Sequence, residues 1–473
     1  MSAPSPRSPA PAGRGKPRVS PFSPAAPVQP LWKPYLAFLV PMIGSNLLQA
    51  ASGSLNNIYV GQMLGVSALA AVTSYFPLMF FMISLIIGLG AGAAVLIGQA
   101  FGAGQTGQIK AIAATTLSVV AAAGVLVAVF GGSATTSILG LLGTPPDVLP
   151  QAVAYARIML IATPGIFIYL LATSMLRGVG DTVTPLFTLG LATLIGMVLT
   201  PALIRGWAGL PQMGVTAPAW ASIISMTIAT TWMVIHLRRR NHPLAPDGVF
   251  LRALGFNRTL LAKVLRIGLP TGIMLVLISL SEILILSLVN PFGSDATASY
   301  GAITQIVNYV QFPAISIGIT ASIFGAQAIG AGRIDRLSEI LRTALAFNLV
   351  LTGSLVVLVY AFSGPLLGLF LADPAVVAEA RTLLHIVVWA LVIYGMGMAT
   401  SSLMRASGMV LLPTVVSATA ILAIGLPVGW ALSARIGIEG VWMSYPVAFC
   451  LLAAGQSALY HLVWKKRPIR RLV

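Results

Sequence analysis

Twelve apolar runs, each long enough to cross a bilayer as a helix, fill almost all of this 473-residue chain after residue 30. About 20 helical residues cross a hydrocarbon core about 30 Å thick. Lipid offers no partner for backbone N–H and C=O groups, so an open apolar run inside it has to be helical. The sequence therefore predicts an all-α membrane protein with twelve transmembrane helices. The runs lie near residues 35–60, 66–97, 110–140, 150–176, 183–204, 214–236, 267–290, 297–325, 340–370, 380–404, 411–433 and 440–464.

The composition supports this class and excludes several others. Only 8% of the residues are charged and 57% are hydrophobic, too few polar groups to cover the surface of a soluble protein of this size. The net charge of +17 comes from basic residues in short segments between the runs, which indicates membrane topology rather than a nucleic-acid partner. The single cysteine excludes an intrachain disulfide, and the four scattered histidines lack metal-ligand spacing. We expect no metal site, no cofactor and no enzyme activity.

Lysine and arginine placement predicts the orientation. If the N-terminus is cytoplasmic, 23 of the 27 basic residues fall on the inner side and four on the outer side. The four outer residues are Arg157, Arg205, Arg381 and Arg435. The sequence thus predicts a multi-pass protein of the cell inner (cytoplasmic) membrane with both termini in the cytoplasm.

The segments outside the runs divide the chain. Residues 1–30 hold nine prolines and no acidic residue, which predicts a disordered, basic, Pro-rich cytoplasmic tail. A basic linker at residues 237–263 separates an N-terminal six-helix lobe, 31–236, from a C-terminal six-helix lobe, 264–464. Residues 465–473 form a second basic tail.

The two halves repeat each other at a nearly constant offset. Pro41 matches Pro270 at an offset of 229, and six further pairs match at 228. An even number of spans per half places both halves in the same orientation, related by a pseudo-two-fold axis along the membrane normal. A cleft between two such lobes is typical of secondary transporters. The six pairs are Gly102 and Gly330, Gly104 and Gly332, Ser174 and Ser402, Arg177 and Arg405, Gly180 and Gly408, and Pro185 and Pro413.

Three motifs resemble those of the MATE family of multidrug and toxic compound extrusion transporters. They are the segment from Ser54 to Thr73, the loop GQAFGAGQ from Gly98 to Gln105 with its echo GAQAIGAGR from Gly325 to Arg333, and SMLRGVGDTVTP from Ser174 to Pro185. The resemblance covers about residues 35–464. It implies a two-lobed antiporter that exports amphipathic, often cationic drugs or metabolites against proton or sodium influx, by alternating access between the lobes.

Glu282 is the only acidic residue of ten that falls near the middle of an apolar run. An ionisable group at that depth is costly and is rarely kept without a use. Two interpretations stay open: a neutral, hydrogen-bonded glutamic acid between helices, or the site where the coupling cation binds. In the second, a proton and a cationic substrate compete for this one charge. A proton needs only the carboxylate, whereas sodium needs several oxygen ligands, so proton coupling is favoured over sodium.

Polar and aromatic residues near Glu282 are candidates for a substrate cavity. Ser279 and Ser281 offer hydroxyl groups, and Gln305, Asn308 and Tyr309 lie on the next run. An aromatic wall on the second run could stack on a flat lipophilic cation, although lipid-facing or packing roles are the more common use of such residues. That wall comprises Tyr75, Phe76, Phe80 and Phe81.

The resemblance also shows where this chain departs from the family. Many members carry an aspartate where this chain has Asn56, and some carry an acid near the position of Tyr394, so these two residues are also candidates for the cation or substrate cavity. It therefore implies that coupling rests on the C-terminal half.

Pro41 and Pro270 interrupt helical hydrogen bonds at equivalent places in the two lobes, so they are hinge candidates, although static kinks are equally compatible.

Three alternatives to this function stay open. A lipid-linked oligosaccharide flippase of related architecture would need a basic cavity, whereas every lysine and arginine falls in a loop or at the end of a run. A two-lobed transporter of the major facilitator type would carry charged residues in the segment from Gly102 to Gln108. A membrane-embedded transferase would need several polar groups at one depth. We expect a monomer whose partners are small amphipathic substrates and membrane lipid.

Overall fold

A computed structural model describes residues 20–23 and 30–473, and most of these residues are helical. The tail predicted for residues 1–30 lies largely outside the described residues. Eleven helical segments are long and apolar enough to cross a membrane, and a bent pair makes the twelfth. The prediction of twelve transmembrane helices is confirmed.

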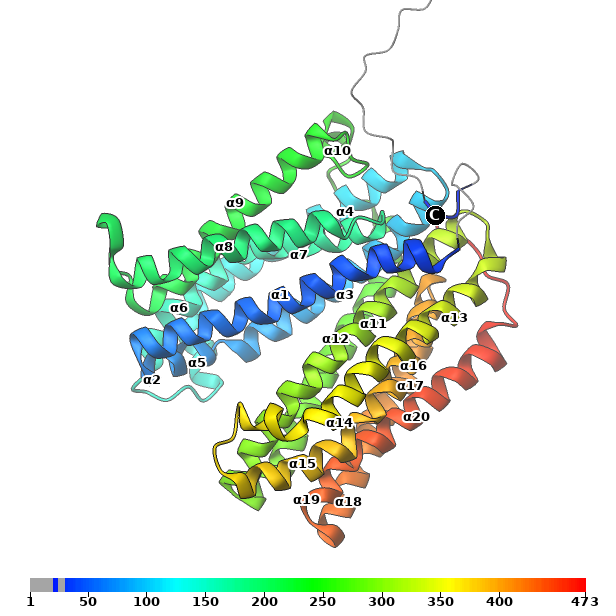
Figure 1. The fold of residues 1–473 in the computed structure, drawn as a ribbon. Coiled ribbons are helices and arrows are strands. Elements are labelled where there is room, and N and C mark those ends of the chain that lie inside the picture. The colour runs from blue at the N-terminus through cyan, green and yellow to red at the C-terminus, as the bar shows by residue number, and fades with distance from the viewer. Residues whose placement is uncertain (1–19, 24–29) are drawn as a thin grey trace, which may run out of the picture.

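The N-terminal lobe contains the first six of these spans (Figure 1). It begins with α1 (Trp32–Leu64), and the second span joins α2 (Val66–Thr73) to α3 (Phe76–Gly102). The third joins α4 (Thr106–Leu126) to α5 (Gly132–Leu141) through a π-helical turn. The fourth is α6 (Leu149–Ile161) with α7 (Thr163–Gly178), and the last two are α8 (Val183–Arg205) and α9 (Ala217–Arg239).

The C-terminal lobe follows the short linker helix α10 (Gly248–Arg252). Its first two spans are α11 (Arg258–Val289) and α12 (Ser294–Gly330). The others are α13 (Leu337–Phe347) with α14 (Gly353–Gly368), α15 (Pro374–Val388) with α16 (Ala390–Ala406), α17 (Leu411–Ala418) with α18 (Leu426–Ile436), and α19 (Ile438–Trp442) with α20 (Ser444–Leu459).

The span predicted at residues 150–176 is not a straight helix. α6 and α7 meet at a bend of 54°. Pro164 lies in the first turn of α7, where a missing N–H and a ring that crowds the preceding turn interrupt the helical ladder. The hinge candidates Pro41 and Pro270 instead lie inside the unbroken helices α1 and α11, and their hinge role stays a prediction.

The pseudo-two-fold repeat is visible in the backbone. Gly180 and Gly408 share a φ of 82°, and Gly104 and Gly332 have φ angles of 72° and 78°. Each of these glycines follows the end of a helix and has a left-handed backbone conformation. This conformation is more strained for a residue that has a Cβ than for glycine. The sequence offset of 228 therefore reflects a structural repeat of the same turns.

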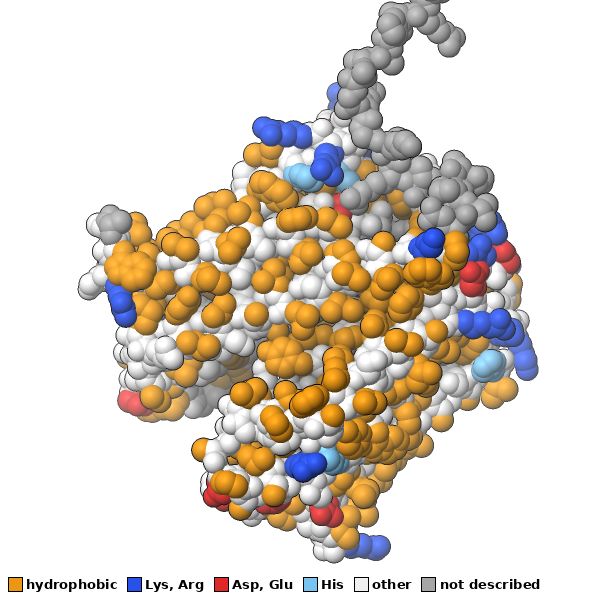
Figure 2. All heavy atoms as spheres, in the orientation of Figure 1, with side chains coloured by type: hydrophobic (Ala, Val, Ile, Leu, Met, Phe, Trp, Pro, Cys, Tyr) orange, Lys and Arg blue, Asp and Glu red, His pale blue; other side chains and the backbone are white. Residues whose placement is uncertain are grey.

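The lobes meet at one end of the molecule, which we call the closed end, and separate toward the other, the open end (Figure 1). A single buried core at the closed end takes side chains from both lobes, whereas each lobe has a core of its own farther away. The space-filling view shows a hollow between the lobes at the open end (Figure 2). Apolar side chains cover the flanks of both lobes in that view, as lipid contact requires.

Candidate functional site

Glu282 lies on α11 with an exposed side chain. Its carboxylate lies close enough to Tyr300, Tyr394 and Tyr445 to interact with each electrostatically. The Tyr300 hydroxyl donates a hydrogen bond to the backbone carbonyl of Glu282 over 3.3 Å and lies 3.5 Å from the Tyr445 hydroxyl. The acid therefore has tyrosine neighbours from three other helices, α12, α16 and α20.

These tyrosines belong to an aromatic cluster inside the C-terminal lobe. Tyr300 packs against Trp442 with ring centroids 5.5 Å apart, and Trp442 stacks on Tyr445 at 5.7 Å. Phe449 packs against both Tyr445 and Tyr394, and its ring centroid lies 5.9 Å from that of Tyr445 and 4.8 Å from that of Tyr394. Because the rings pack against one another, the tyrosine hydroxyl groups around Glu282 are held in defined positions. Tyr394 is the residue predicted on another helix that interacts electrostatically with Glu282.

The polar residues predicted next to Glu282 are arranged differently. Ser281 is buried, and its hydroxyl donates to the Ile278 carbonyl of its own helix over 2.6 Å. Ser279 is half-buried on α11, and Gln305 and Asn308 are half-buried on α12. Within the described residues, no hydrogen bond joins any of these four side chains to the Glu282 carboxylate. Tyr309 is exposed and packs edge-on against Phe312.

The predicted aromatic wall is divided, because Tyr75 and Phe76 pack within the N-terminal lobe whereas Phe80 and Phe81 are exposed. Tyr75 is only 1% exposed and packs edge-on against Tyr155, with ring centroids 6.0 Å apart. Phe76 is half-buried and packs against the same core of the N-terminal lobe. Tyr75 lies at the break between α2 and α3. Tyr75 is therefore a packing residue, which corrects the expectation of a cavity role.

The N-terminal lobe contains a pocket of its own, with a volume of about 340 Å³. Asn56 lines it, as do residues from α1, α3, α6, α7, α8 and α9, and none of the lining residues is charged. Thr193 contributes a buried hydroxyl without a hydrogen-bond partner, so the pocket presents a polar atom that a ligand can satisfy. No residue of the C-terminal lobe lines it. The cavity candidate Asn56 therefore lines a pocket of the N-terminal lobe, whereas Glu282 lies on α11 of the C-terminal lobe.

Methionines and tyrosines on the walls of this pocket were not predicted from the sequence. Methionine side chains are flexible and polarizable, and they adapt to ligands of different shape. The lining methionines come from four separate helices, so no local motif connects them, and only the fold reveals the set. The residues are Met79, Met159, Met197 and Met226, with Tyr59 and Tyr169.

Two glutamines at equivalent positions join the lobes at the closed end. The Gln99 side-chain amide donates to the Ala406 carbonyl over 2.8 Å, and that of Gln327 donates to the Gly178 carbonyl over 3.0 Å. Each bond runs from one lobe to the other, and the two bonds are related by the offset of 228. The closed end is therefore sealed symmetrically around the pseudo-two-fold axis.

Both described ends of the chain bind to these same glutamines. The Ser20 hydroxyl donates to Oε1 of Gln327 over 3.1 Å, and the backbone N–H of Leu472 donates to Oε1 of Gln99 over 2.7 Å. Lys263 on α11 donates to the Leu472 carbonyl over 2.5 Å. The two terminal segments thus lie across the seam between the lobes at the closed end.

Two of the helix pairs that cross between the lobes, α3 with α11 and α1 with α12, pack differently. Gly88 of α3 lies directly on Gly272 of α11: a Cβ added at Gly88 would come within 2.4 Å of the Gly272 nitrogen. On the other side, Tyr35 of α1 donates to the Ile317 carbonyl of α12 over 2.8 Å, and Asn46 donates to the Ser316 hydroxyl over 2.9 Å. One crossing is a backbone contact, and the other depends on side-chain hydrogen bonds.

No cluster of three or more histidine, cysteine, aspartate or glutamate side chains is present in the described part of the chain.

A protein-family model, MatE, matches residues 41–202 and again 270–431. The chain is 43% identical over 445 residues to the probable multidrug resistance protein YoeA of Bacillus subtilis, covering 94% of this chain and 96% of the relative. It is 27% identical over 326 residues to the FAD transporter of Shewanella oneidensis, covering 68% and 71%. A crystal structure of a mutant of the MATE transporter VcmN from Vibrio cholerae superposes with a TM-score of 0.84 at 22% identity, covering 93% of this chain and 98% of that one. The repeated match of one family model agrees with the internal duplication.

Proposed function

Because this chain belongs to the MATE family of multidrug efflux transporters, we propose that it exports amphipathic cations by antiport against protons, with alternating access between its two lobes. The observation that carries the proposal is that the pocket and the acidic residue lie in different lobes. The N-terminal lobe holds an uncharged pocket lined by methionines and tyrosines, and the C-terminal lobe holds the only acidic residue at mid-span depth.

The pocket supports substrates without a strong negative charge. A flat lipophilic cation can stack on Tyr59 or Tyr169, and the adaptable methionines accept several shapes. An anion as strongly charged as FAD, the compound named for the Shewanella relative, would find no basic side chain in the pocket lining. The same lack of a basic cavity disfavours a flippase for lipid-linked oligosaccharides.

The orientation follows from the charges. The closed end carries Ser20, the C-terminal segment and most of the described basic residues, so we place it in the cytoplasm. The hollow between the lobes then opens to the outside, so the described conformation is outward-open. In the inward-open state the seam around Gln99 and Gln327 separates, while the lobes close over the hollow.

Because the proposed substrate pocket is separate from Glu282, we expect substrate and proton to be coupled through closure of the lobes. Glu282 is exposed in the outward-open state, and closing the lobes over it would bury an ionised carboxylate, which costs several kcal/mol. A proton that binds from outside removes this cost, so the lobes close once Glu282 is neutral. Proton release to the cytoplasm then resets the site. Coupling of this kind needs no direct contact between substrate and carboxylate, in contrast to simple competition for one charge.

The coupling ion is tested with purified protein in liposomes. Export of a fluorescent amphipathic cation such as ethidium is measured under a proton gradient alone and then under a sodium gradient alone. We expect transport with the proton gradient, because Glu282 and its tyrosines offer one carboxylate and few further oxygen ligands. Transport that responds only to sodium would contradict the proposal.

The contacts between the chain ends and the glutamines are expected to oppose inward opening. Deletion of residues 470–473 removes the hydrogen bonds of Leu472 with Gln99 and Lys263, at about 1 kcal/mol each. Inward-open molecules should therefore increase about 10- to 30-fold. The measurement is cytoplasmic labelling of Ser316→Cys, a buried seam position, in a Cys450→Ser background.

Two point variants control this experiment. Gln99→Leu should reproduce most of the increase in labelling. Gln105→Leu changes an exposed glutamine six residues later and should leave the rate of labelling unchanged. Equal labelling of the deletion variant and the full chain would show that the terminal contacts do not hold the seam.

A further inference from the structure

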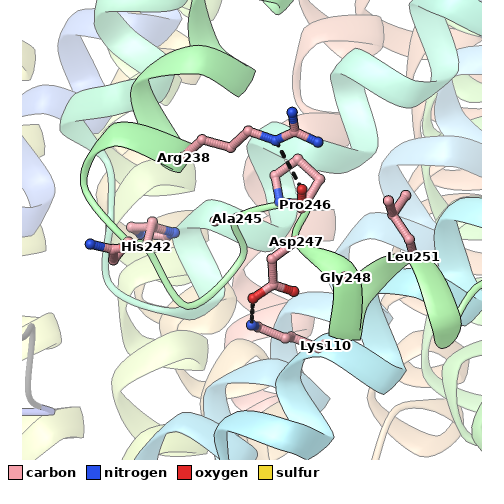
Figure 3. A pocket seen from close by; sticks show the side chains of 9 residues that line it. Lys110, Arg238, His242, Ala245, Pro246, Asp247, Gly248 and Leu251 are labelled. Atoms are coloured by element: carbon pink, nitrogen blue, oxygen red, sulfur yellow. Dashed lines mark hydrogen bonds and ion pairs between the residues drawn. The ribbon is translucent and has the colours of Figure 1, made fainter.

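A second cavity, of about 400 Å³, lies at the closed end of the N-terminal lobe, beneath the linker between the lobes. Lys110 of α4 and Arg238 of α9 line it together with the loop that precedes and forms α10 (Figure 3). No step of the transport cycle described above uses this cavity. Its position at the ends of two membrane helices places it at the level of lipid headgroups.

The charges of the cavity favour an anion. Lys110 forms an ion pair with Asp247, and this bond lowers the pKa of the Asp247 carboxyl, so the pair is neutral overall at pH 7. Arg238 uses its Nε to donate to the Pro246 carbonyl over 2.9 Å. Its two terminal nitrogens make no hydrogen bond within the described residues, so they remain able to bind an oxyanion. Arginine suits phosphate because its planar group donates two parallel hydrogen bonds.

Apolar side chains of the linker continue from this cavity. Val249, Leu251, Leu254 and Phe256 are 60%, 53%, 44% and 68% exposed. All four lie between the spans that end at Arg239 and begin at Arg258. Phe250 between them is buried and anchors α10 to the core. Four exposed large apolar residues within eight positions would be unfavourable in water, so they indicate contact with lipid.

A hydrogen bond to α4 shows that this apolar segment lies farther from the closed end than the cavity does. The backbone N–H of Gly255 donates to the Ser118 hydroxyl over 3.1 Å. Ser118 is twelve residues after the start of α4 at Thr106, about 18 Å along the helix axis, whereas Lys110 is only about 6 Å along it. The cationic cavity and the apolar residues are therefore offset by about 12 Å in the direction that leads from a headgroup to its acyl chains.

We propose that the cavity and the apolar linker residues form a binding site for one anionic phospholipid of the inner leaflet. The lipid phosphate binds Arg238 at the cavity, and an acyl chain lies along Leu251, Leu254 and Phe256. The inference rests on the orientation proposed above, because it assigns the closed end to the cytoplasmic side. The bound lipid would attach the linker, and with it the junction between the lobes, to the membrane.

Lipid binding is measured by native mass spectrometry on purified transporter titrated with phosphatidylglycerol or with phosphatidylcholine of the same chains. We expect phosphatidylglycerol to bind more tightly. Arg238→Gln should weaken that binding about 5- to 10-fold, as expected for one basic residue at an anionic surface. Arg435→Gln, an exposed arginine at the opposite end of the molecule, should have no effect. Equal affinity of the wild-type protein and Arg238→Gln would overturn the site. Displacement of phosphatidylglycerol by millimolar inorganic phosphate would show a site for soluble anions instead.

The depth of the apolar residues is measured separately. In the Cys450→Ser background, Phe256→Cys carries an environment-sensitive fluorophore in liposomes, and quenching by lipids brominated on the acyl chain is recorded. Strong quenching supports the site, and quenching only by aqueous iodide overturns it. Asp335→Cys, in an exposed loop of the other lobe, serves as the water-exposed control. Neither measurement requires transport, so failure here leaves the proposed function intact.

Discussion

Glu282→Gln is expected to abolish substrate-driven proton release from proteoliposomes. The amide has nearly the shape of the acid but carries neither charge nor a proton that can be released. The lobes of this variant would close and open without an ion, so export would lose its link to the proton gradient. The measurement follows an internal pH-sensitive dye while an amphipathic cation is supplied, and the rate should fall to that of empty liposomes.

The surroundings of Glu282 provide the controls for this prediction. Asp295→Asn removes an exposed acid in the first turn of α12, in the same lobe, and should leave exchange unchanged. Tyr394→Phe and Tyr445→Phe remove the neighbouring hydroxyl groups while preserving the rings, and should shift the pH dependence of exchange rather than abolish it. Normal proton release by a folded Glu282→Gln variant would refute the proposed coupling.

Gly102→Ala and Gly330→Ala are expected to destabilise the protein more than other glycine substitutions. A Cβ at Gly102 would lie 2.0 Å from the Gln327 carbonyl oxygen, and one at Gly330 would lie 1.9 Å from that of Gln99. The clash is with backbone, which cannot rotate away, so α3 and α12 would have to separate where the lobes join. We expect a loss of about 3 kcal/mol or more for each, at or above the usual range for overpacking.

The internal repeat predicts how the effects of the two substitutions compare. Because the two glycines occupy equivalent sites, their alanine variants should lower the thermal unfolding midpoint by similar amounts. Gly107→Ala, where an added Cβ meets nothing within 4 Å, serves as the matched control and should cost little or stabilise slightly. Unchanged midpoints in the two seam variants would mean that the helices do not approach this closely.

The architecture was largely predictable from the sequence. Apolar runs of 20 or more residues have one stable form in lipid, and the offset of 228 between Gly180 and Gly408 corresponds to identical backbone turns in the structure. Glu282 was identifiable because an acid in an apolar run is rare.

The direction in which each side chain faces was not predictable. In a soluble helix the polar stripe marks the outside, but a membrane helix is apolar toward both lipid and protein. Tyr75 therefore resembled a cavity residue in the sequence, although it is buried against Tyr155. For the same reason, Tyr300 and Tyr445 beside Glu282 and the methionines of the N-terminal pocket could not be identified beforehand.

The sequence by itself determined that this chain is a duplicated membrane protein with twelve transmembrane helices and one acidic residue at mid-span depth, since length, apolarity and repeated glycines act locally. The tertiary structure alone decided that this acid lies among tyrosines of the C-terminal lobe while the pocket lies in the other lobe. It also decided that Ser20 and Leu472, near the two ends of the described chain, bind Gln327 and Gln99. The physical reason is that both arrangements depend on packing between helices that are far apart in the sequence. In lipid, both the outer and the packed face of a helix are apolar, so the sequence has no amphipathic pattern that indicates which face packs.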